Sequence, residues 1–159
     1  MNKRNMLLLA ATLLVGGCAQ MTAAGNPPPN VTCQGSCDVD VTVTRIAPPP
    51  GCSIDIADGI NVQPNPGGNV QIKWKINGDN AFKFGQPPNQ QNGIVFGKPN
   101  SPGVPPASVM APNGAGGGRT ITLNDNHRDP STKGHWLYNV YVGDGGSANC
   151  EVDPWVDNN

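Results

Sequence analysis

Apolar and polar residues alternate in several short segments of this 159-residue chain, and no segment beyond residue 18 shows a sustained helical period. Because successive side chains of a β-strand point to opposite faces, this alternation predicts half-buried strands. The clearest case covers residues 70–76, where the apolar parity holds Val70, Ile72, Trp74 and Ile76. The chain is therefore expected to fold as β-structure.

Further strands are predicted wherever the same alternation recurs. The expected segments are residues 38–46, 52–56, 60–62, 82–84, 94–96, 119–123, 135–142 and 150–155. The last is expected to be an edge strand interrupted by Pro154. Asn77-Gly78 is expected to form a tight hairpin-type turn, because both residues tolerate a positive φ. Short strands of this kind between Gly- and Pro-rich turns predict an all-β fold, a Greek-key β-sandwich of immunoglobulin or cupredoxin shape with long Gly/Pro/Asn-rich loops.

The longest irregular segment covers residues 85–118, which are dense in Pro, Gly and Asn and poor in apolar residues. A connection of this length is either functional or mobile. We expect this loop, together with the exposed end of the sandwich, to form a binding surface.

The N-terminus has the layout of a secretion signal. Lys3 and Arg4 precede an apolar run over residues 6–15, which is too short to span a bilayer as a permanent helix. The run closes with the tetrapeptide Val15-Gly16-Gly17-Cys18. This tetrapeptide resembles the lipobox of bacterial lipoproteins, which implies diacylation of the cysteine. The alternative is an ordinary signal peptide with an incidental cysteine.

The lipobox resemblance implies a domain organisation and an address. Residues 1–17 would be a lipoprotein signal peptide, residues 18–30 a lipidated flexible tether with a stiff Pro-rich end, and residues 31–159 the β-sandwich domain. In lipoproteins of this kind an Asp after the cysteine marks retention in the inner membrane. This chain has Ala19 there, which favours the outer membrane of a Gram-negative bacterium, facing the periplasm or the cell surface.

Besides Cys18 the chain has four cysteines, and an even number behind an export signal indicates two disulfides. Of the three possible connectivities we expect Cys52 with Cys150, because both share the parity of apolar neighbours, and Cys33 with Cys37 across a short turn. Metal ligation by these thiols is disfavoured, because the single Cys-x₃-Cys spacing lacks a second pair.

Two parts of the chain resemble small sandwich domains of exported proteobacterial proteins. The motifs are Cys52-Ser53-Ile54-Asp55-Ile56 with Ile72-Lys73-Trp74-Lys75-Ile76, and Leu137-Tyr138-Asn139-Val140-Tyr141-Val142 with Asp153-Pro154-Trp155-Val156. The resemblance implies the fold and no particular activity, because sandwiches host unrelated functions. Neither tyrosine is followed two residues later by cysteine, which departs from true immunoglobulin domains.

The charge balance excludes a general role in nucleic-acid binding. The chain has ten basic and eleven acidic residues, and removal of the leader takes Lys3 and Arg4 with it, which leaves a net charge of minus three. A general nucleic-acid binder needs a basic face. No basic residue follows Lys133, so the C-terminal part is mildly acidic.

A copper site of the blue-copper type requires two His, one Cys and a weak Met ligand. The residue types exist at Met110, His127, His135 and Cys150. No His or Met follows Cys150, however, and that cysteine is expected in a disulfide. We therefore expect no bound metal, with His127 a solvated loop residue and His135 an outward residue opposite Trp136. The Asp-rich turn over residues 125–129 is a weak candidate for Ca²⁺.

The sequence indicates no single catalytic arrangement. A serine nucleophile would need a base and an orienting acid. Several combinations are possible, with His127 as the base, Asp125 or Asp129 as the acid, and any of three serines, Ser101, Ser108 and Ser131. Glu151 and Asp153 share a strand face, which could suggest paired carboxylates. The favoured interpretation is an acidic edge strand that deters edge-to-edge association.

These observations favour a lipid-anchored cell-envelope protein that acts as a non-enzymatic binding or structural module. Its expected partners are the membrane, through the N-terminal lipid, and an envelope protein or glycan. No cofactor is expected. An envelope enzyme or enzyme inhibitor is the first alternative, and a metal-binding cupredoxin-like protein is the second.

We predict that Cys18→Ser abolishes lipidation and leaves an unprocessed precursor, because acylation needs the thiol and precedes cleavage. Metabolic labelling with a radioactive or clickable fatty acid measures this directly. Label on the mutant chain would contradict the assignment of Cys18.

Overall fold

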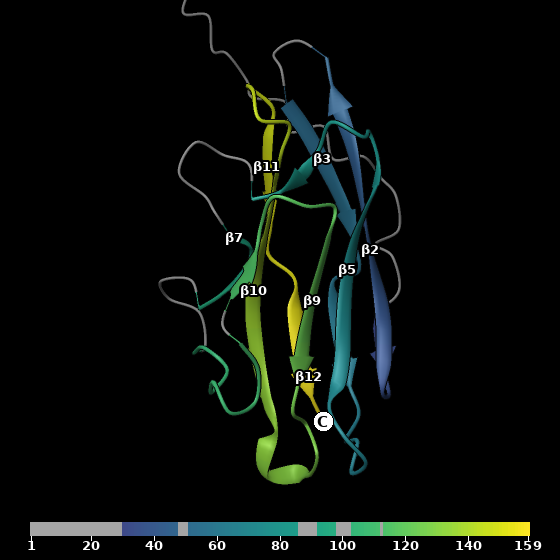
Figure 1. Ribbon diagram of the computed structural model, residues 1–159, viewed down its shortest axis with the longest axis vertical. Coiled ribbons are helices and arrows are strands. Elements are labelled where there is room, and N and C mark those ends of the chain that lie inside the picture. Colours follow the sequence, from purple (N-terminus) through teal and green to yellow (C-terminus); the bar gives the residue numbers. More distant parts are fainter. Residues whose placement is uncertain (1–29, 48–50, 86–91, 98–102, 112) are drawn as a thin grey trace, which may run out of the picture.

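Twelve strands and one short 3-10 helix make up the part of the chain that the computed structural model describes, which is residues 30–47, 51–85, 92–97, 103–111 and 113–159. The strands pack as two sheets face to face (Figure 1). In chain order the elements are β1 (Val31–Cys33), β2 (Ser36–Ile46), β3 (Gly51–Ile56), β4 (Gly59–Val62), β5 (Val70–Gly78), β6 (Lys83–Phe84), β7 (Asn92–Phe96), β8 (Asn113–Ala115), β9 (Thr120–Asp125), η1 (Pro130–Thr132), β10 (Gly134–Gly143), β11 (Asn149–Val152) and β12 (Trp155–Asn158). The predicted all-β sandwich is confirmed.

The smaller sheet has the strand order β3-β2-β5-β9. β2 runs parallel to β5 and antiparallel to β3, and β5 runs antiparallel to β9. Along β2 the burial alternates, with Val39, Val41 and Val43 facing the core. In residues 38–46 and 70–76 the apolar positions of the predicted alternation therefore face the core, and the polar positions face outward.

The larger sheet has the order β1-β4-β12-β10-β7-β8, and β11 and β6 also pair with β10. β11 and β12 run along β10 in one register, since Cys150 lies opposite Val142 and Val156 lies opposite Trp136. Pro154 separates the two strands, and its carbonyl accepts a hydrogen bond from the Tyr138 N–H at 2.9 Å. The predicted interruption is thus present.

The prediction of a terminal edge strand is correct for one half of this segment and wrong for the other. Among the described residues β11 pairs only with β10, whereas β12 lies between β10 and β4. The parallel pairing with β4 comes from a segment almost a hundred residues earlier in the chain, which periodicity cannot reveal.

The core between the sheets is centred on Trp74 of β5 and Tyr138 of β10, both fully buried. Their rings meet edge to face with centroids 5.6 Å apart, and the indole N–H donates to the tyrosine hydroxyl at 3.1 Å. This hydrogen bond pairs the indole N–H of Trp74 with the hydroxyl of Tyr138, while both rings add apolar area to the core. Burial raises the pKa of Tyr138, so this hydroxyl stays neutral.

The expected turn at Asn77-Gly78 is wrong, because both residues belong to β5. Asn77 pairs with Thr42 and Gly78 with Val43, and the chain then crosses to β6 in the other sheet. Gly78 has a φ of 88°, and a Cβ there would lie 2.4 Å from the carbonyl oxygen of Val43. The glycine therefore permits the strand end to approach β2 closely.

The interpretation of residues 85–118 as one irregular segment is also wrong for the described part of it, which contains β7 and β8. The alternation predicts residues 94–96 of β7 but not β8, and glycines in both strands are required by packing. A Cβ at Gly93 would lie 2.3 Å from the Cβ of Phe84, and one at Gly114 would lie 2.6 Å from a methyl group of Ile121. Residues 103–111 are described and belong to no named strand, whereas residues 86–91, 98–102 and 112 lie outside the described residues.

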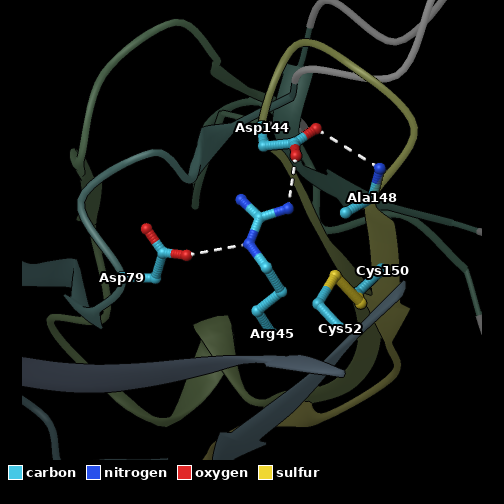
Figure 2. The surroundings of a disulfide bond; sticks show 6 residues. All are labelled: Arg45, Cys52, Asp79, Asp144, Ala148 and Cys150. Carbon is cyan, nitrogen blue, oxygen red and sulfur yellow. Dashed lines mark hydrogen bonds and ion pairs between the residues drawn. A yellow bond between two sulfur atoms is a disulfide. The ribbon is translucent and has the colours of Figure 1, made fainter. Parts of the chain in front are cut away.

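Both predicted disulfides are present. Cys33 and Cys37 close a small ring next to the core, and Cys52 and Cys150 join β3 of the small sheet to β11 of the large sheet. The second bond is therefore a covalent link between the two layers at one end of the sandwich (Figure 2).

Arg45 reinforces this cross-linked end. It lies opposite Cys52 in the β2–β3 register. Its guanidinium contacts Asp79 Oδ2 at 3.0 Å and Asp144 Oδ2 at 2.8 Å, as Figure 2 shows. The Arg45 ion pair is the main cause that lowers the pKa of Asp144, whose other oxygen accepts hydrogen bonds from the turn that follows it. Because Arg45 and Asp79 are partly exposed to solvent, these ion pairs contribute more to loop positioning than to stability.

The only helix in the described residues is the three-residue η1, and none there is long and apolar enough to cross a membrane.

We predict that Cys52→Ala with Cys150→Ala lowers the melting temperature far more than Cys33→Ala with Cys37→Ala. The first bond spans 98 residues and the second spans 4. On the chain-entropy model the long loop is worth about 4 to 5 kcal/mol, and the short one is worth less. Thermal unfolding of the two double variants measures the difference. Equal losses, or peptide mapping that links Cys33 to Cys150, would contradict the account.

Candidate functional site

A buried polar cluster lies where the end of β9 meets η1 and the end of β12. Its members are Asp125, His127, Thr132 and Asn158, and three of them, all except Thr132, are at most 2 % exposed. The amide nitrogen of Asn158 donates to Asp125 Oδ1 at 3.1 Å. This cluster contains the residues that the sequence offered for a base, an orienting acid or a metal ligand.

The prediction that His127 is a solvated loop residue is wrong, because its side chain is completely buried. Its Nδ1 lies 2.7 Å from Thr132 Oγ1, and its Nε2 lies 2.8 Å from the main-chain oxygen of Asn159. That oxygen can only accept, so Nε2 donates. With both ring nitrogens engaged, His127 ties η1 to the chain after β12, and it could bind a metal only by losing one of these bonds.

Asp125 is a buried carboxyl group with incomplete hydrogen bonding. Desolvation raises its pKa to about 6, against the opposing effects of the Asn158 amide and of His127. Its Oδ2 and the Oδ1 of Asn158 are both buried without a hydrogen-bond partner. Protonation would turn Oδ2 from an unpaired acceptor into a donor, so the neutral acid is the form that suits this environment.

The four residues considered for copper are not brought together. Cys150 is bonded to Cys52, so it has no thiolate to offer. His135 is exposed on the outer face of β10, as predicted, and the centroid of its ring lies 5.4 Å from that of Trp155. Met110 is buried, and its backbone forms an isolated β-bridge with that of Asp125. No three His, Cys, Asp or Glu residues group at metal-binding distance within the described ranges.

The other metal and catalytic candidates have structural roles where they are described. Asp129 accepts a hydrogen bond from the Ser131 backbone N–H at 2.7 Å and so shapes the η1 turn. His127 bonds to a threonine and not to a serine. Ser101 lies outside the described residues, and Ser108 contributes its carbonyl oxygen to Asn126.

The outer face of the large sheet carries a partly exposed aromatic surface that sequence reasoning missed. Trp155 and Leu137 lie opposite each other on β12 and β10, and neither belongs to the core between the sheets. His135 and Asp157 form the next cross-strand pair. We call these four residues, with Gly59 of β4, the Trp155 face.

Gly59 determines how the indole of Trp155 lies. The two residues pair across the β4–β12 ladder, and a Cβ at Gly59 would lie only 2.1 to 2.4 Å from three atoms of the six-membered ring. The indole therefore occupies the space of the missing side chain and rests on the sheet. The parity of Trp155 and Asp157 opposite the buried Val156 is the sequence signal that could have revealed this face.

Acidic residues continue along the same parity. Glu151 and Asp153 precede Trp155, and Asp157 follows it, so that all three carboxyl groups lie on the outer side of the continuous β11–β12 segment. Asn139 of β10 donates to Asp153 Oδ1 at 2.5 Å. The predicted pair of Glu151 and Asp153 on one face is thus present, with Asp153 engaged by a neighbouring strand.

No protein-family model and no curated protein sequence matches the chain. Among solved structures it is similar to a rusticyanin with a methionine-to-leucine substitution, at 13% identity and a TM-score of 0.34 over 82% of this chain and 81% of that one. It is also similar to reduced rusticyanin, at 15% identity and a TM-score of 0.33 over 82% and 84%. Likenesses at these scores say nothing about ligands or activity.

We predict that the free energy of unfolding falls as pH rises through about 6. The folded-state pKa of Asp125 is about 6, whereas an unfolded Asp has a pKa of about 3.9. The folded chain therefore binds this proton more tightly, and its contribution is complete below about pH 3.9 and lost above about pH 6, at most about 3 kcal/mol.

Denaturant titrations between about pH 4 and 8 test this dependence on the variant Asp125→Asn, which removes the titrating group. This variant should lack most of the decline. The matched control is Asp55→Asn on β3, an exposed Asp, which should behave as the unmodified chain. An unchanged pH slope in Asp125→Asn would show that another group is responsible.

Proposed function

We propose that this chain is a lipid-anchored cell-envelope protein that acts as a non-enzymatic binding module. The observation that carries the proposal is the division of polar groups in the fold. The buried candidates, His127 and Asp125, hold β9, η1 and β12 together, and two of the cysteines link the sheets. The surface that we assign to recognition is the Trp155 face, whose partly exposed side chains lie outside the core.

The membrane anchor is proposed from the sequence. Cys18, the signal peptide and nearly all of the tether lie outside the described residues. Two disulfides suit an oxidising compartment outside the inner membrane. A lipid on Cys18 and the Pro-rich tether that follows would hold the sandwich at the outer membrane while leaving its sheet faces accessible.

The proposed binding surface differs from the loop surface expected from the sequence. In the described part of residues 85–118, Val109 and Met110 are buried and β7 and β8 are paired into the large sheet. These contacts give that segment a structural role. The Trp155 face lies on strands, which position side chains more firmly than loops do.

In-cell photocrosslinking tests the proposed function. Leu137 on the Trp155 face would be replaced by p-benzoyl-phenylalanine, and Thr122, exposed on the outer face of the small sheet, serves as the matched control. We expect a discrete crosslinked product with one envelope component from position 137 and none from position 122. The product should disappear in a Cys18→Ser background. Equal products from both positions, or none from either, would contradict the proposal.

A further inference from the structure

The Trp155 face combines an aromatic surface with uncompensated negative charge. The indole rests on Gly59, so one of its π-faces points away from the sheet. The ring of His135 lies next to the indole, with the two centroids 5.4 Å apart and the ring planes inclined by 34°. The partly exposed indole therefore offers an aromatic face on which another planar group could stack.

The charged groups around this surface are carboxylates. Asp157 lies two residues from Trp155 on the same side of β12. The exposed Asp58 immediately precedes Gly59, and its main-chain carbonyl accepts a hydrogen bond from the backbone N–H of Trp155 at 3.0 Å. β4, β10 and β12 contain no Lys or Arg. The nearest basic residue along these strands is Lys133, which is exposed and precedes β10.

From this juxtaposition we infer that the Trp155 face binds arginine side chains of a basic segment in an envelope protein. A cation over a tryptophan ring is attracted by the π-electrons, and carboxylates at the rim add to the attraction. A guanidinium is planar and stacks on an indole while it donates to a carboxylate, which an ammonium cannot do as well. An uncharged sugar would also stack on the indole but would leave the charges of Asp58 and Asp157 uncompensated.

This inference rests on the proposed function, because it names the chemistry of the partner at the same face. Binding is measured by isothermal titration calorimetry on the detergent-solubilised full chain with the peptide acetyl-(Gly-Arg)₄-amide. The comparison ligands are acetyl-(Gly-Lys)₄-amide, acetyl-(Gly-Gln)₄-amide and chitotetraose. We expect the arginine peptide to bind several-fold more tightly than the lysine peptide, the other two not to bind, and the affinity to fall with added salt.

Two variants place the interaction on the Trp155 face. Trp155→Ala should weaken binding of the arginine peptide at least tenfold, and Asp157→Asn should weaken it several-fold while leaving the aromatic packing intact. Asp55→Asn makes the same charge change on the other sheet and should have no effect. An equal effect of Asp55→Asn, binding of chitotetraose in place of the arginine peptide, or no binding of any ligand would overturn the inference.

The crosslinking experiment and the peptide titration can fail independently of each other. A crosslinked product from position 137 without peptide binding would leave the binding module intact and remove only the cationic partner. Loss of both results would remove the module itself.

Discussion

The register between β10 and the β11–β12 segment is the constraint on which the rest of the structure depends. It persists across Pro154, so one alignment places Cys150 opposite Val142, Val156 opposite Trp136 and Trp155 opposite Leu137. A slip by one residue would exchange the two faces of the strand. It would expose Val156, bury the charge of Asp157 and move Cys150 away from its disulfide partner. The inter-sheet link, the core and the outer aromatic surface therefore share one cause.

The polar groups of the fold divide into two classes. Most of those inside, such as the Trp74–Tyr138 pair and the ring nitrogens of His127, bond to other elements of the chain, and Asp125 Oδ2 and Asn158 Oδ1 are the unpaired exceptions among the described residues. Those on the outer face of the large sheet accompany aromatic rings that make no contribution to the core. The residues that the sequence offered for metal binding or catalysis, such as His127, Asp125 and Cys150, belong to the inner class and therefore have structural roles.

The sequence predicted the features that depend on residues close together in the chain. Alternation located the strands around residues 38–46, 70–76 and 135–142, and parity helped to pair Cys52 with Cys150. It could not predict the parallel pairings of β2 with β5 and β4 with β12, which join segments distant in the chain. Asn77-Gly78 misled because its glycine serves a close strand contact, and His127 misled because burial depends on η1 and Asn159 together. Parity could have placed Trp155 on the outer face, but the position of its indole over Gly59 follows only from the β4–β12 ladder.

Interstrand nuclear Overhauser effects on the isotope-labelled protein test the shared register most directly. The account predicts backbone contacts between Trp136 and Val156 and, in the same spectra, between Val142 and Cys150. Both pairs must be present together, because a single alignment spans Pro154. Contacts of Trp136 with Trp155 or Asp157 in place of Val156 would show a register shifted by one residue and would contradict the assignment of the Trp155 face to the outside of the sheet.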